Sequence, residues 1–478
     1  MRRCLVWLRH DLRHRDHPAL QAACADPESE VVAVYLRTPR QWELHDLGAA
    51  RIAFEQAALP GLQADLAALN IALVVAEVAD DTQIPAWMAR HVAAWSIHHL
   101  YAHRAHEIDE QRRDAAVAAA VAEQACGMSL LDDVCLVPPG RVLTREGRPY
   151  TVFTPFKKAW LTHLAGVPAA RGAPPPRQRC WLDGSAVAVP ASQDSWTRFW
   201  PAGEAAALTR LERFIATDLS GYAVARDHPE SDGSSRLSPY LAVGNISVRQ
   251  CLQALRRHGS GDASGAASWL NELCWRDFYR HILAAFPRVC RHQAFLGATD
   301  ALPWRHDTGD FARWCEGRTG FPIVDAGLRQ LREQAWMHNR LRMICASFLA
   351  KDLFIDWRWG ERHFMRHLLD ADLAANNGGW QWCASTGNDA VPYFRVFNPV
   401  LQSRRFDPQG DFIRRYVPEL ATLDARSIHA PDAAMLRARG IDYPPPMLDH
   451  AQARTRVIAH FRGLRTLNAA QMSLFSAT

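Results

Sequence analysis

The first quarter of the chain alternates short apolar runs with longer segments of helical periodicity. Apolar residues recur three and four positions apart in residues 49–69, 83–94 and 108–124, which predicts helices there. The apolar runs are short enough to be buried strands of a parallel sheet. This alternation predicts a Rossmann-like, doubly wound α/β domain. The predicted strands are residues 4–8, 31–36, 71–75 and 97–101.

The pattern changes after residue 132. It lapses near Pro138, and proline becomes frequent between residues 169 and 201, which predicts a long linker over the surface. Beyond it strand signals almost vanish, and helical periodicity returns in residues 250–257, 269–286 and 324–350. The predicted organisation is an α/β domain at 1–132, an interdomain linker at 133–200, an all-α domain at 201–465 and a C-terminal tail at 466–478.

Several classes of protein are excluded by features that the sequence lacks. No G-x-G-x-x-G follows the first predicted strand, which argues against dinucleotide binding in the usual Rossmann mode. No apolar run approaches the roughly 18 residues that span a bilayer, and the apolar opening is too short for a signal peptide. We therefore expect a cytoplasmic protein. The 11 cysteines are scattered without a C-x-x-C pair, so neither a metal site nor a disulfide framework is predicted.

The net charge of +5 is unevenly distributed. The positive surplus lies in the second part of the chain and is nearly all arginine, because lysine occurs only at positions 157, 158 and 351. Arginine binds phosphate through two parallel hydrogen bonds, so the surplus is compatible with nucleic-acid binding. Taken alone, a solvated arginine-rich surface explains it more simply.

Residues 370–382 hold an unusual mixture for thirteen positions. Two acids, two side-chain amides, two adjacent glycines and two indoles occur together. Adjacent glycines allow a flat ligand to approach the backbone, and amides donate and accept at the edge of a heterocycle. The stretch therefore indicates a bound non-protein group. The alternative is a Gly-Gly helix break beside two core tryptophans.

Three other segments hold polar groups in helical or helix-starting patterns. Residues 234–238 (Ser-Ser-Arg-Leu-Ser) fit either a phosphate-binding helix start or a simple N-cap. In residues 269–286 Glu272, Trp275 and Arg276 share one helical face, either as a surface ion pair or as an acid with a raised pKa beside a flat substrate. In residues 324–350 one face predicts a polar cavity, although an apolar stripe is ordinarily core. That face carries Trp336, Arg340, Met343 and Ser347, with Asn339 at its edge.

The joint order of four motifs resembles the photolyase and cryptochrome family. They are W-x-x-E-L-x-W-R-D-F-Y-R at 269–280, G-F-P-I-V-D-A at 320–326, W-M-H-N-R-L-R-M at 336–343 and F-R-V-F-N-P at 394–399. The resemblance runs from residue 5 to about residue 462. It is closest to the bacterial class I cyclobutane pyrimidine dimer DNA photolyases, and it implies an antenna domain followed by a helical FAD-binding domain.

The resemblance implies that the chain binds FAD. Asn376 matches the residue that faces flavin N5, where a neutral amide accepts from N5–H and does not repel the anionic reduced flavin. Plant and animal cryptochromes have Asp and Cys at this position. Ser234 stands where the family usually has Thr. The residues matching the flavin shell are Tyr222, Ser234, Ser235, Arg236, Leu237, Ser238, Trp269, Arg276, Asn339, Asp370, Asp372 and Asn376.

It also implies light-driven repair of UV-damaged DNA. Excited FADH⁻ would donate an electron to a pyrimidine dimer flipped out of the helix, and the electron would return after the cyclobutane ring has split. Glu272 matches the acid that hydrogen-bonds the dimer. The other residues matching the repair pocket are Trp275, Asn339, Arg340, Met343 and Trp382. Six-four photolyases have His in place of Asn339, and DASH cryptochromes usually have Gln in place of Met343.

Two further electron and light functions follow from the resemblance. Trp380, Trp357 and Trp304 match the family's relay that reduces oxidised FAD in light, although each would also serve as core packing. The N-terminal domain is expected to bind an antenna pigment, with methenyltetrahydrofolate as the first choice and a deazaflavin as the alternative. Arg291 departs from the lysine of the enterobacterial enzymes. The residues matching the antenna site are His45, Glu107, Cys290 and Arg291.

The expected partner is DNA that contains pyrimidine dimers. We expect a monomer without a membrane or an obligate protein partner, bound to the nucleoid when on DNA. The alternative function is a blue-light cryptochrome photoreceptor without repair activity. The intact pocket residues and the short segment after the last helical match favour repair.

Overall fold

The computed structural model describes residues 2–182, 194–258 and 263–475, with the side chains of 263 and 465–475 left aside. The chain forms two compact units. The first contains Met1–Ala223, Ser235–Pro287 and Leu369–Asp372, and the second contains Val224–Ser234, Arg288–Leu368 and Leu373–Thr478. The predicted interdomain linker includes 183–193, which lie outside the described residues. The predicted domain boundaries remain a prediction.

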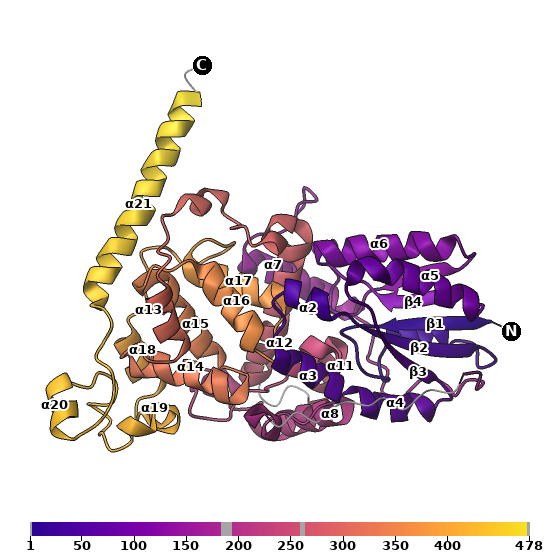
Figure 1. Cartoon of the computed structure of the whole chain (residues 1–478), viewed down its shortest axis with the longest axis horizontal. Helices are drawn as coiled ribbons and strands as arrows, with labels where there is room; N and C mark the ends of the chain where they lie inside the picture. Colours follow the sequence, from indigo (N-terminus) through magenta and orange to yellow (C-terminus); the bar gives the residue numbers. More distant parts are fainter. Residues whose placement is uncertain (1, 183–193, 259–262, 476–478) are drawn as a thin grey trace. The chain divides into compact units, whose positions relative to one another are not determined.

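A five-stranded parallel sheet forms the centre of the first unit (Figure 1). Its strand order is β3-β2-β1-β4-β5, which confirms the predicted doubly wound α/β fold. All four predicted strands are present, and β5 was not predicted. The strand β5 lies at an edge of the sheet and is only partly buried. Its apolar pattern is therefore too weak to be recognised in the sequence. The strands are β1 Arg3–Leu8, β2 Glu30–Arg37, β3 Ala72–Glu77, β4 His99–His103 and β5 Gly127–Leu131.

Alternate residues of the strands build two cores, one on each face of the sheet. Cys4, Val6 and Leu8 of β1 pack with α1 (Pro18–Ala23) and α4 (Leu59–Ala67). Leu5 and Trp7 point the other way. They pack with α5 (Ile84–Ala94) and α6 (Ile108–Ala122), which lie together on one side of the sheet in Figure 1. Both faces are therefore buried, which explains why the strands read as continuous apolar runs.

Two segments predicted as single helices are each two helices. Residues 49–69 form α3 (Ala49–Ala57) and α4, because Pro60 in the first turn of α4 has no N–H to continue a helix. Residues 324–350 form α14 (Pro322–Gln334) and α15 (Asn339–Ser347). Ala335 has a left-handed φ of 50°, and His338 accepts the Arg340 N–H as the N-cap of α15. Trp336 therefore lies before α15, and its predicted place on the Arg340 face was wrong.

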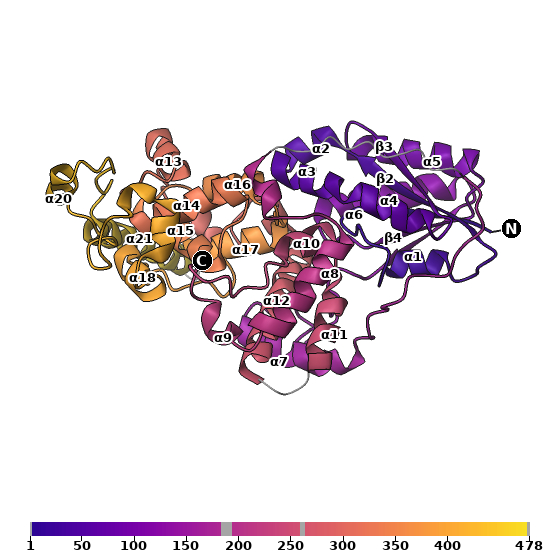
Figure 2. The ribbon, with the colours of Figure 1, turned by 90° about the horizontal axis from the view of Figure 1, so that it is seen from below.

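The first unit also contains helices from the segments predicted as linker and as all-α domain. The helix α7 lies inside the predicted linker, and α8, α10, α11 and α12 lie inside the predicted all-α domain. Figure 2 shows α8, α11 and α12 side by side. Buried Asp277 of α12 accepts hydrogen bonds from the Trp160 indole of α7 and from the Val137 N–H. The helices are α2 Pro39–Leu44, α7 Phe153–His163, α8 Glu204–Arg213, α10 Ser238–Val243, α11 Val248–His258 and α12 Ala263–Ala285.

The second unit is helical, and its described residues include no sheet strand. The helix α21 covers most of the predicted tail, of which 476–478 lie outside the described residues. Among the described helices, none is long and apolar enough to cross a bilayer. The helices are α13 Thr308–Cys315, α14, α15, α16 Trp357–His367, α17 Leu373–Ala384, α18 Pro399–Phe406, α19 Asp411–Tyr416, α20 Ala433–Ala438 and α21 His450–Phe475, with a π-turn at Phe348–Asp352. The short α9, Tyr222–Ala225, crosses the boundary of the units.

Candidate flavin and DNA-repair site

The helix α17 carries most of the mixed stretch that the sequence analysis singled out. It is continuous over Leu373–Ala384, so Gly378 and Gly379 lie within a helix and do not break it. The half-buried Asn376 donates from Nδ2 to the carbonyl oxygen of Glu361 at 2.9 Å. Because a carbonyl oxygen only accepts, this bond fixes the amide orientation and leaves Oδ1 as an acceptor for another group. Asn376 therefore presents its side-chain oxygen as a hydrogen-bond acceptor.

The Glu361 side chain supports this helix from α16. It is fully buried, and its two oxygens accept from Asn377 Nδ2 at 2.8 Å and contact His292 Nδ1 at 3.0 Å. Asn377 Oδ1 in turn accepts from Gln381 Nε2 at 2.7 Å. Glu361 therefore fixes α17 through both its carboxylate and its backbone. Sequence reasoning missed Glu361, since its neighbours on α17 are distant in the chain.

In the first unit an ion pair holds one of the predicted flavin residues. Arg280 of α12 donates to the Asp372 carboxylate. Burial alone would lower the pKa of Arg280, but the charges of Asp372, Glu107 and other acidic groups together outweigh burial and raise it. Burial and the neighbouring Arg280 charge lower the pKa of Arg276, which donates to the carbonyl oxygen of Val134. Arg280 stands in the first recognised motif but was not predicted as a site residue.

The predicted flavin-shell segment 235–238 of the first unit contains a tight backbone turn. Arg236 has a φ of 50°, a left-handed conformation that a non-glycine residue rarely adopts and that is common at ligand sites. The helix α10 begins only at Ser238, and Leu237 occupies its N-cap without a side-chain hydrogen bond. The simple N-cap interpretation of the serines is therefore wrong. Trp269 and Tyr222 both pack against Phe214. Asp370, two residues before Asp372, is buried.

The three tryptophans of the predicted relay all lie in the second unit and are buried. Trp357 is the first residue of α16, Trp380 lies on α17, and Trp304 packs against Phe354 with ring centroids 4.8 Å apart. The indole N–H groups of all three lack a hydrogen-bond acceptor among the described residues. An unpaired buried donor is costly, which argues for a function beyond packing.

Most predicted contacts to the lesion also lie in the second unit. Arg340 donates to Asp227 Oδ1 at 2.5 Å, and its guanidinium carbon lies 4.3 Å from the centroid of the Phe406 ring. Asn339 is exposed and, like Arg340, lies within 4 Å of the Met343 sulfur. Trp382 is half-buried on α17. The structure thus brings Asn339, Arg340 and Met343 together as predicted, and adds Asp227, which sequence reasoning missed.

Two predicted lesion contacts, Glu272 and Trp275, lie on α12 in the first unit. Both are half-buried. The Trp275 ring stacks face to face on Phe153, with centroids 3.6 Å apart and an angle of 4° between the planes. This contact holds the indole rigidly and covers one of its faces, so a substrate ring would meet only the other face.

The predicted antenna residues are divided between the two units. His45 is the C-cap of α2. Its Nδ1 lies 3.3 Å from Glu110 Oε1, and its Nε2 lies 2.8 Å from Gln41 Nε2. The hydrogen bond to Glu110 raises the pKa of His45. Glu107 instead accepts from the His106 N–H as α6 begins. Cys290 and Arg291 belong to the second unit. Glu110 was not predicted, because it lies one helical turn past Glu107.

The chain matches known proteins over nearly its full length. Residues 4–177 match the DNA photolyase family, and residues 269–463 match the FAD binding domain of DNA photolyase. A protein of Escherichia coli named deoxyribodipyrimidine photo-lyase is 43% identical, over 96% of this chain and 98% of that protein. One of the same name from Vibrio cholerae is 44% identical, over 94% and 97%.

Solved structures agree with this fold. A bacterial class III photolyase from Agrobacterium tumefaciens superposes with a TM-score of 0.88 at 33% identity, over 98% of both chains. A Synechocystis cryptochrome gives 0.84 at 27% identity, over 96% of this chain and 99% of that one. Fold and site residues define a flavin-binding protein with an α/β domain and a helical domain. The chain belongs to the DNA photolyase family.

Proposed function

We propose that this chain repairs cyclobutane pyrimidine dimers in DNA in a light-driven reaction, with reduced FAD as its cofactor. The observation that carries the proposal is the fixed amide of Asn376. Its Nδ2 is committed to the Glu361 carbonyl, so the group offered to a flavin is a neutral acceptor. A neutral acceptor stabilises N5–H and does not repel the anionic reduced flavin, which is the form that repair requires.

The residues present fit FAD. Arg276 and Arg236 bring positive charge for the phosphates, and the left-handed backbone at Arg236 is a conformation found at anion-binding turns. Arg280 holds Asp372 ready to accept from the polar edge of the ligand. A Cβ at Gly379 would meet none of the described atoms within 4 Å, which leaves room for a ligand to approach α17 at this point. When bound, reduced and excited by light, FAD supplies the electron that splits the dimer and receives it back.

The chain's own residues bind and orient the lesion. Glu272, as the protonated acid, donates a hydrogen bond to a carbonyl oxygen of the dimer. Trp275, stacked on Phe153, offers one ring face to its bases. Asn339 and Arg340 contact its polar edge, and Met343 and Trp382 provide apolar surface. Asp227 holds the Arg340 guanidinium in place before the substrate arrives. A damaged pair stacks poorly, which reduces the cost of taking it out of the helix.

The tryptophans Trp304, Trp357 and Trp380 pass electrons that keep the flavin reduced. An indole that has lost an electron becomes a much stronger acid and readily gives its N–H proton to an adjacent base. The three N–H groups have no acceptor among the described residues, so the positive charge stays mobile instead of being trapped by proton loss. This arrangement supports a relay better than it supports plain core packing.

The first unit binds an antenna pigment, for which methenyltetrahydrofolate is our first choice and a deazaflavin the alternative. His45 and Glu110 supply an ordered donor and acceptor beside the partly exposed α2. We add Glu110 to the proposed antenna residues of this unit, His45 and Glu107. Extraction of the pigments from the purified protein, followed by their absorption spectra, identifies the antenna.

A repair assay tests the central proposal. Purified, reduced protein is incubated with dimer-containing oligothymidine, and absorbance near the thymine maximum is followed under blue light. Recovery of thymine absorbance that requires both light and reduced flavin supports repair. Absence of recovery, with flavin bound and reduced, would instead place the chain with cryptochrome photoreceptors.

Two other measurements test the remaining proposals. Sedimentation of the free protein and of its DNA complex tests the proposed monomer. Fluorescence microscopy of a fusion protein tests the proposed cytoplasmic, nucleoid-bound location.

A further inference from the structure

The first unit contains two clusters of histidine and carboxylate that the flavin and DNA chemistry does not use. One comprises Asp11, His17 and His103, and the other comprises His14, Asp65 and Glu204. In each, one ligand atom from every residue lies within 4.8 Å of the others. Neither was predicted from the sequence, since no local motif joins these positions. The two clusters differ in the hydrogen bonds that their histidine ring nitrogens make, and this difference decides whether a metal ion could bind.

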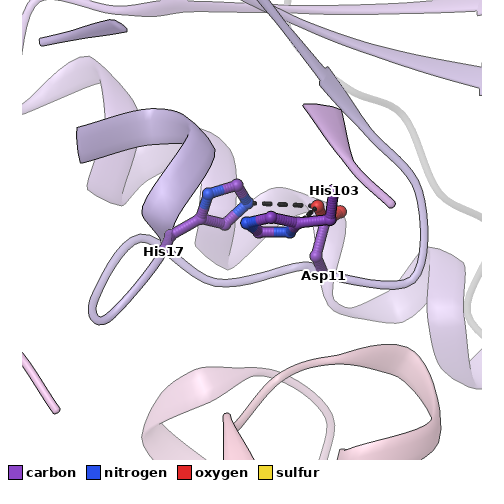
Figure 3. A group of neighbouring side chains, drawn as sticks. All are labelled: Asp11, His17 and His103. Atoms are coloured by element: carbon purple, nitrogen blue, oxygen red, sulfur yellow. Dashed lines mark hydrogen bonds and ion pairs between the residues drawn. The ribbon is translucent and has the colours of Figure 1, made fainter. Parts of the chain in front are cut away.

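The Asp11 cluster holds two neutral histidines and no place for a metal ion. Figure 3 shows both imidazole rings directed at the Asp11 carboxylate, with His103 Nδ1 at 2.7 Å and His17 Nε2 at 3.3 Å. The opposite ring nitrogens accept backbone N–H groups, from Ala19 to His103 and from Leu20 to His17. Each ring must therefore carry its proton on the nitrogen that faces Asp11. A metal ion needs those same nitrogens unprotonated.

The His14 cluster joins three separate segments of the first unit. His14 lies in the connection from β1 to α1, Asp65 on α4, and Glu204 is the first residue of α8. His14 Nδ1 lies 2.8 Å from Glu204 Oε2 and 3.2 Å from Asp65 Oδ2. The side chains of His14 and Glu204 are 10% and 5% exposed, whereas that of Asp65 is 46% exposed. The cluster is thus built on buried residues and open to solvent on the Asp65 side.

The buried His14 Nδ1 makes no hydrogen bond, although two carboxylate oxygens lie so near. His17 Nε2 shares this feature, but its ring already accepts the Leu20 N–H at the other nitrogen. For His14, at these distances, the missing bond means that both oxygens lie beside the axis of the Nδ1 lone pair and not on it. A protonated histidine in a simple ion pair would point its N–H at one of them. Ligands of one metal ion have the arrangement found here, because each points at the ion and they lie side by side. Zinc bonds of about 2.0 to 2.2 Å place tetrahedral ligands about 3.3 to 3.5 Å apart. The 3.2 Å distance to Asp65 is close to this range, and Glu204 Oε2, at 2.8 Å, must move away from His14 Nδ1 by about 0.5 Å when the ion binds.

We propose that His14, Asp65 and Glu204 bind a divalent transition-metal ion such as zinc. One imidazole nitrogen and two carboxylate oxygens suit zinc, and the open side leaves room for water as a further ligand. The ion neutralises two clustered carboxylates. Glu204 Oε2 also accepts the His14 backbone N–H at 2.8 Å, which orients that carboxylate. Bound metal would tie the start of α8 to the α/β sheet and stabilise the first unit.

Zinc binding to the flavin-containing full-length protein tests this proposal. The protein is stripped with a chelator and titrated with zinc against a chromogenic competitor. Asp65→Asn removes a half-exposed ligand without disturbing the core, and Glu123→Gln removes an exposed acid elsewhere in the same unit as a control. We expect one tight site in the parent and in Glu123→Gln, and at least about tenfold weaker binding in Asp65→Asn. Equal zinc affinity of Asp65→Asn and the parent would overturn the proposal.

Two further measurements make the outcome independent of that one variant. Zinc should raise the melting temperature of the parent and of Glu123→Gln but not that of Asp65→Asn, because a ligand that binds only the folded state stabilises it. Anomalous diffraction from zinc-soaked crystals should show a peak within bonding distance of His14 Nδ1, Asp65 and Glu204. A parent that binds no stoichiometric zinc and gives no such peak would show that the cluster is an ion pair only.

Discussion

Gly360 of α16 lies directly against the indole of Trp380. A Cβ placed on Gly360 would come within 2.1 Å of Cη2 and 2.5 Å of Cζ3 of that ring, which no real contact allows. The Trp380 ring is also bounded by Phe364 and Trp314, with centroids 5.0 and 6.1 Å away. Gly360, Phe364 and Trp314 therefore confine the indole. Glycine at position 360 sets the position of the first tryptophan of the proposed relay.

Gly360→Ala should therefore slow light-driven reduction of bound FAD. The added methyl group forces the Trp380 ring out of place, and overpacking of this kind costs about 1 to 3 kcal/mol of stability. Repair by chemically reduced protein should change much less, because the relay is not used there. Flavin absorbance under blue light with an external reductant measures the first rate, and thymine absorbance measures the second.

Gly463→Ala is the matched control, since it also places a methyl group on a helix of the second unit but meets no atom within 4 Å. It should leave photoreduction unchanged. Equal rates of FAD photoreduction in Gly360→Ala and in the parent would contradict this prediction. They would show either that Trp380 is not part of the relay or that the displaced ring still transfers electrons equally well.

Asn376→Asp should lower the reduction potential of the bound flavin. The carboxylate loses the Nδ2 bond to the Glu361 carbonyl and brings a negative charge toward an anionic cofactor. An unfavourable interaction of about 1.4 kcal/mol shifts a one-electron potential by about 59 mV. Spectroelectrochemical titration measures the shift. Asn376→Ala removes the same hydrogen bond without adding charge, and an equal shift in both variants would rule out the charge as the cause.

Much of the fold was predictable because its signals are local. Strands such as residues 4–8 are apolar on both faces, and the periodic helices follow each of them. The weak strand β5 and the breaks at Ala58 and Ala335 were missed. A strand at the sheet edge has little apolar character, and single turns interrupt a periodic pattern without erasing it.

The candidate site divides in the same way. Its motif residues were found because the order of short motifs is specific. The partners that hold them were not found: Glu361 beneath Asn376, Arg280 beside Asp372 and Asp227 beside Arg340. Each pair joins segments that are separated in the chain. Such contacts exist only once the tertiary structure has formed, and one sequence carries no local sign of them.

Glu272→Ala should slow dimer repair at least about tenfold while FAD remains bound. Loss of a hydrogen bond from a charged or polar partner in the active complex costs about 1.5 to 3 kcal/mol. The flavin spectrum and the protein-to-flavin ratio establish cofactor content, and the blue-light assay gives the repair rate. Glu272→Gln keeps a hydrogen-bonding group of the same size and should lie between the alanine variant and the parent. Release of flavin from both variants would show that Glu272 is structural.

Lys351 should make stability depend on pH in the alkaline range. It is fully buried in the second unit, where Nζ donates to Ser385 Oγ at 2.6 Å, and burial lowers its pKa from 10.5 to about 7. Between these values the unfolded chain binds a proton that the folded protein does not. The stability contributed by this group is therefore complete above about pH 10.5 and is lost as the pH falls toward and through 7.

The expected slope is at most about 1.4 kcal/mol per pH unit, since one proton is involved. Denaturant unfolding of the parent and of Lys351→Met at several pH values between 7 and 9 measures it as the difference between the two proteins. Subtraction cancels the titration of other groups, and methionine fills similar volume without a charge. Lys158→Met, at a lysine of the other unit, serves as the control and should run parallel to the parent. Parallel curves for the parent and Lys351→Met would show that Lys351 keeps its proton when the protein folds.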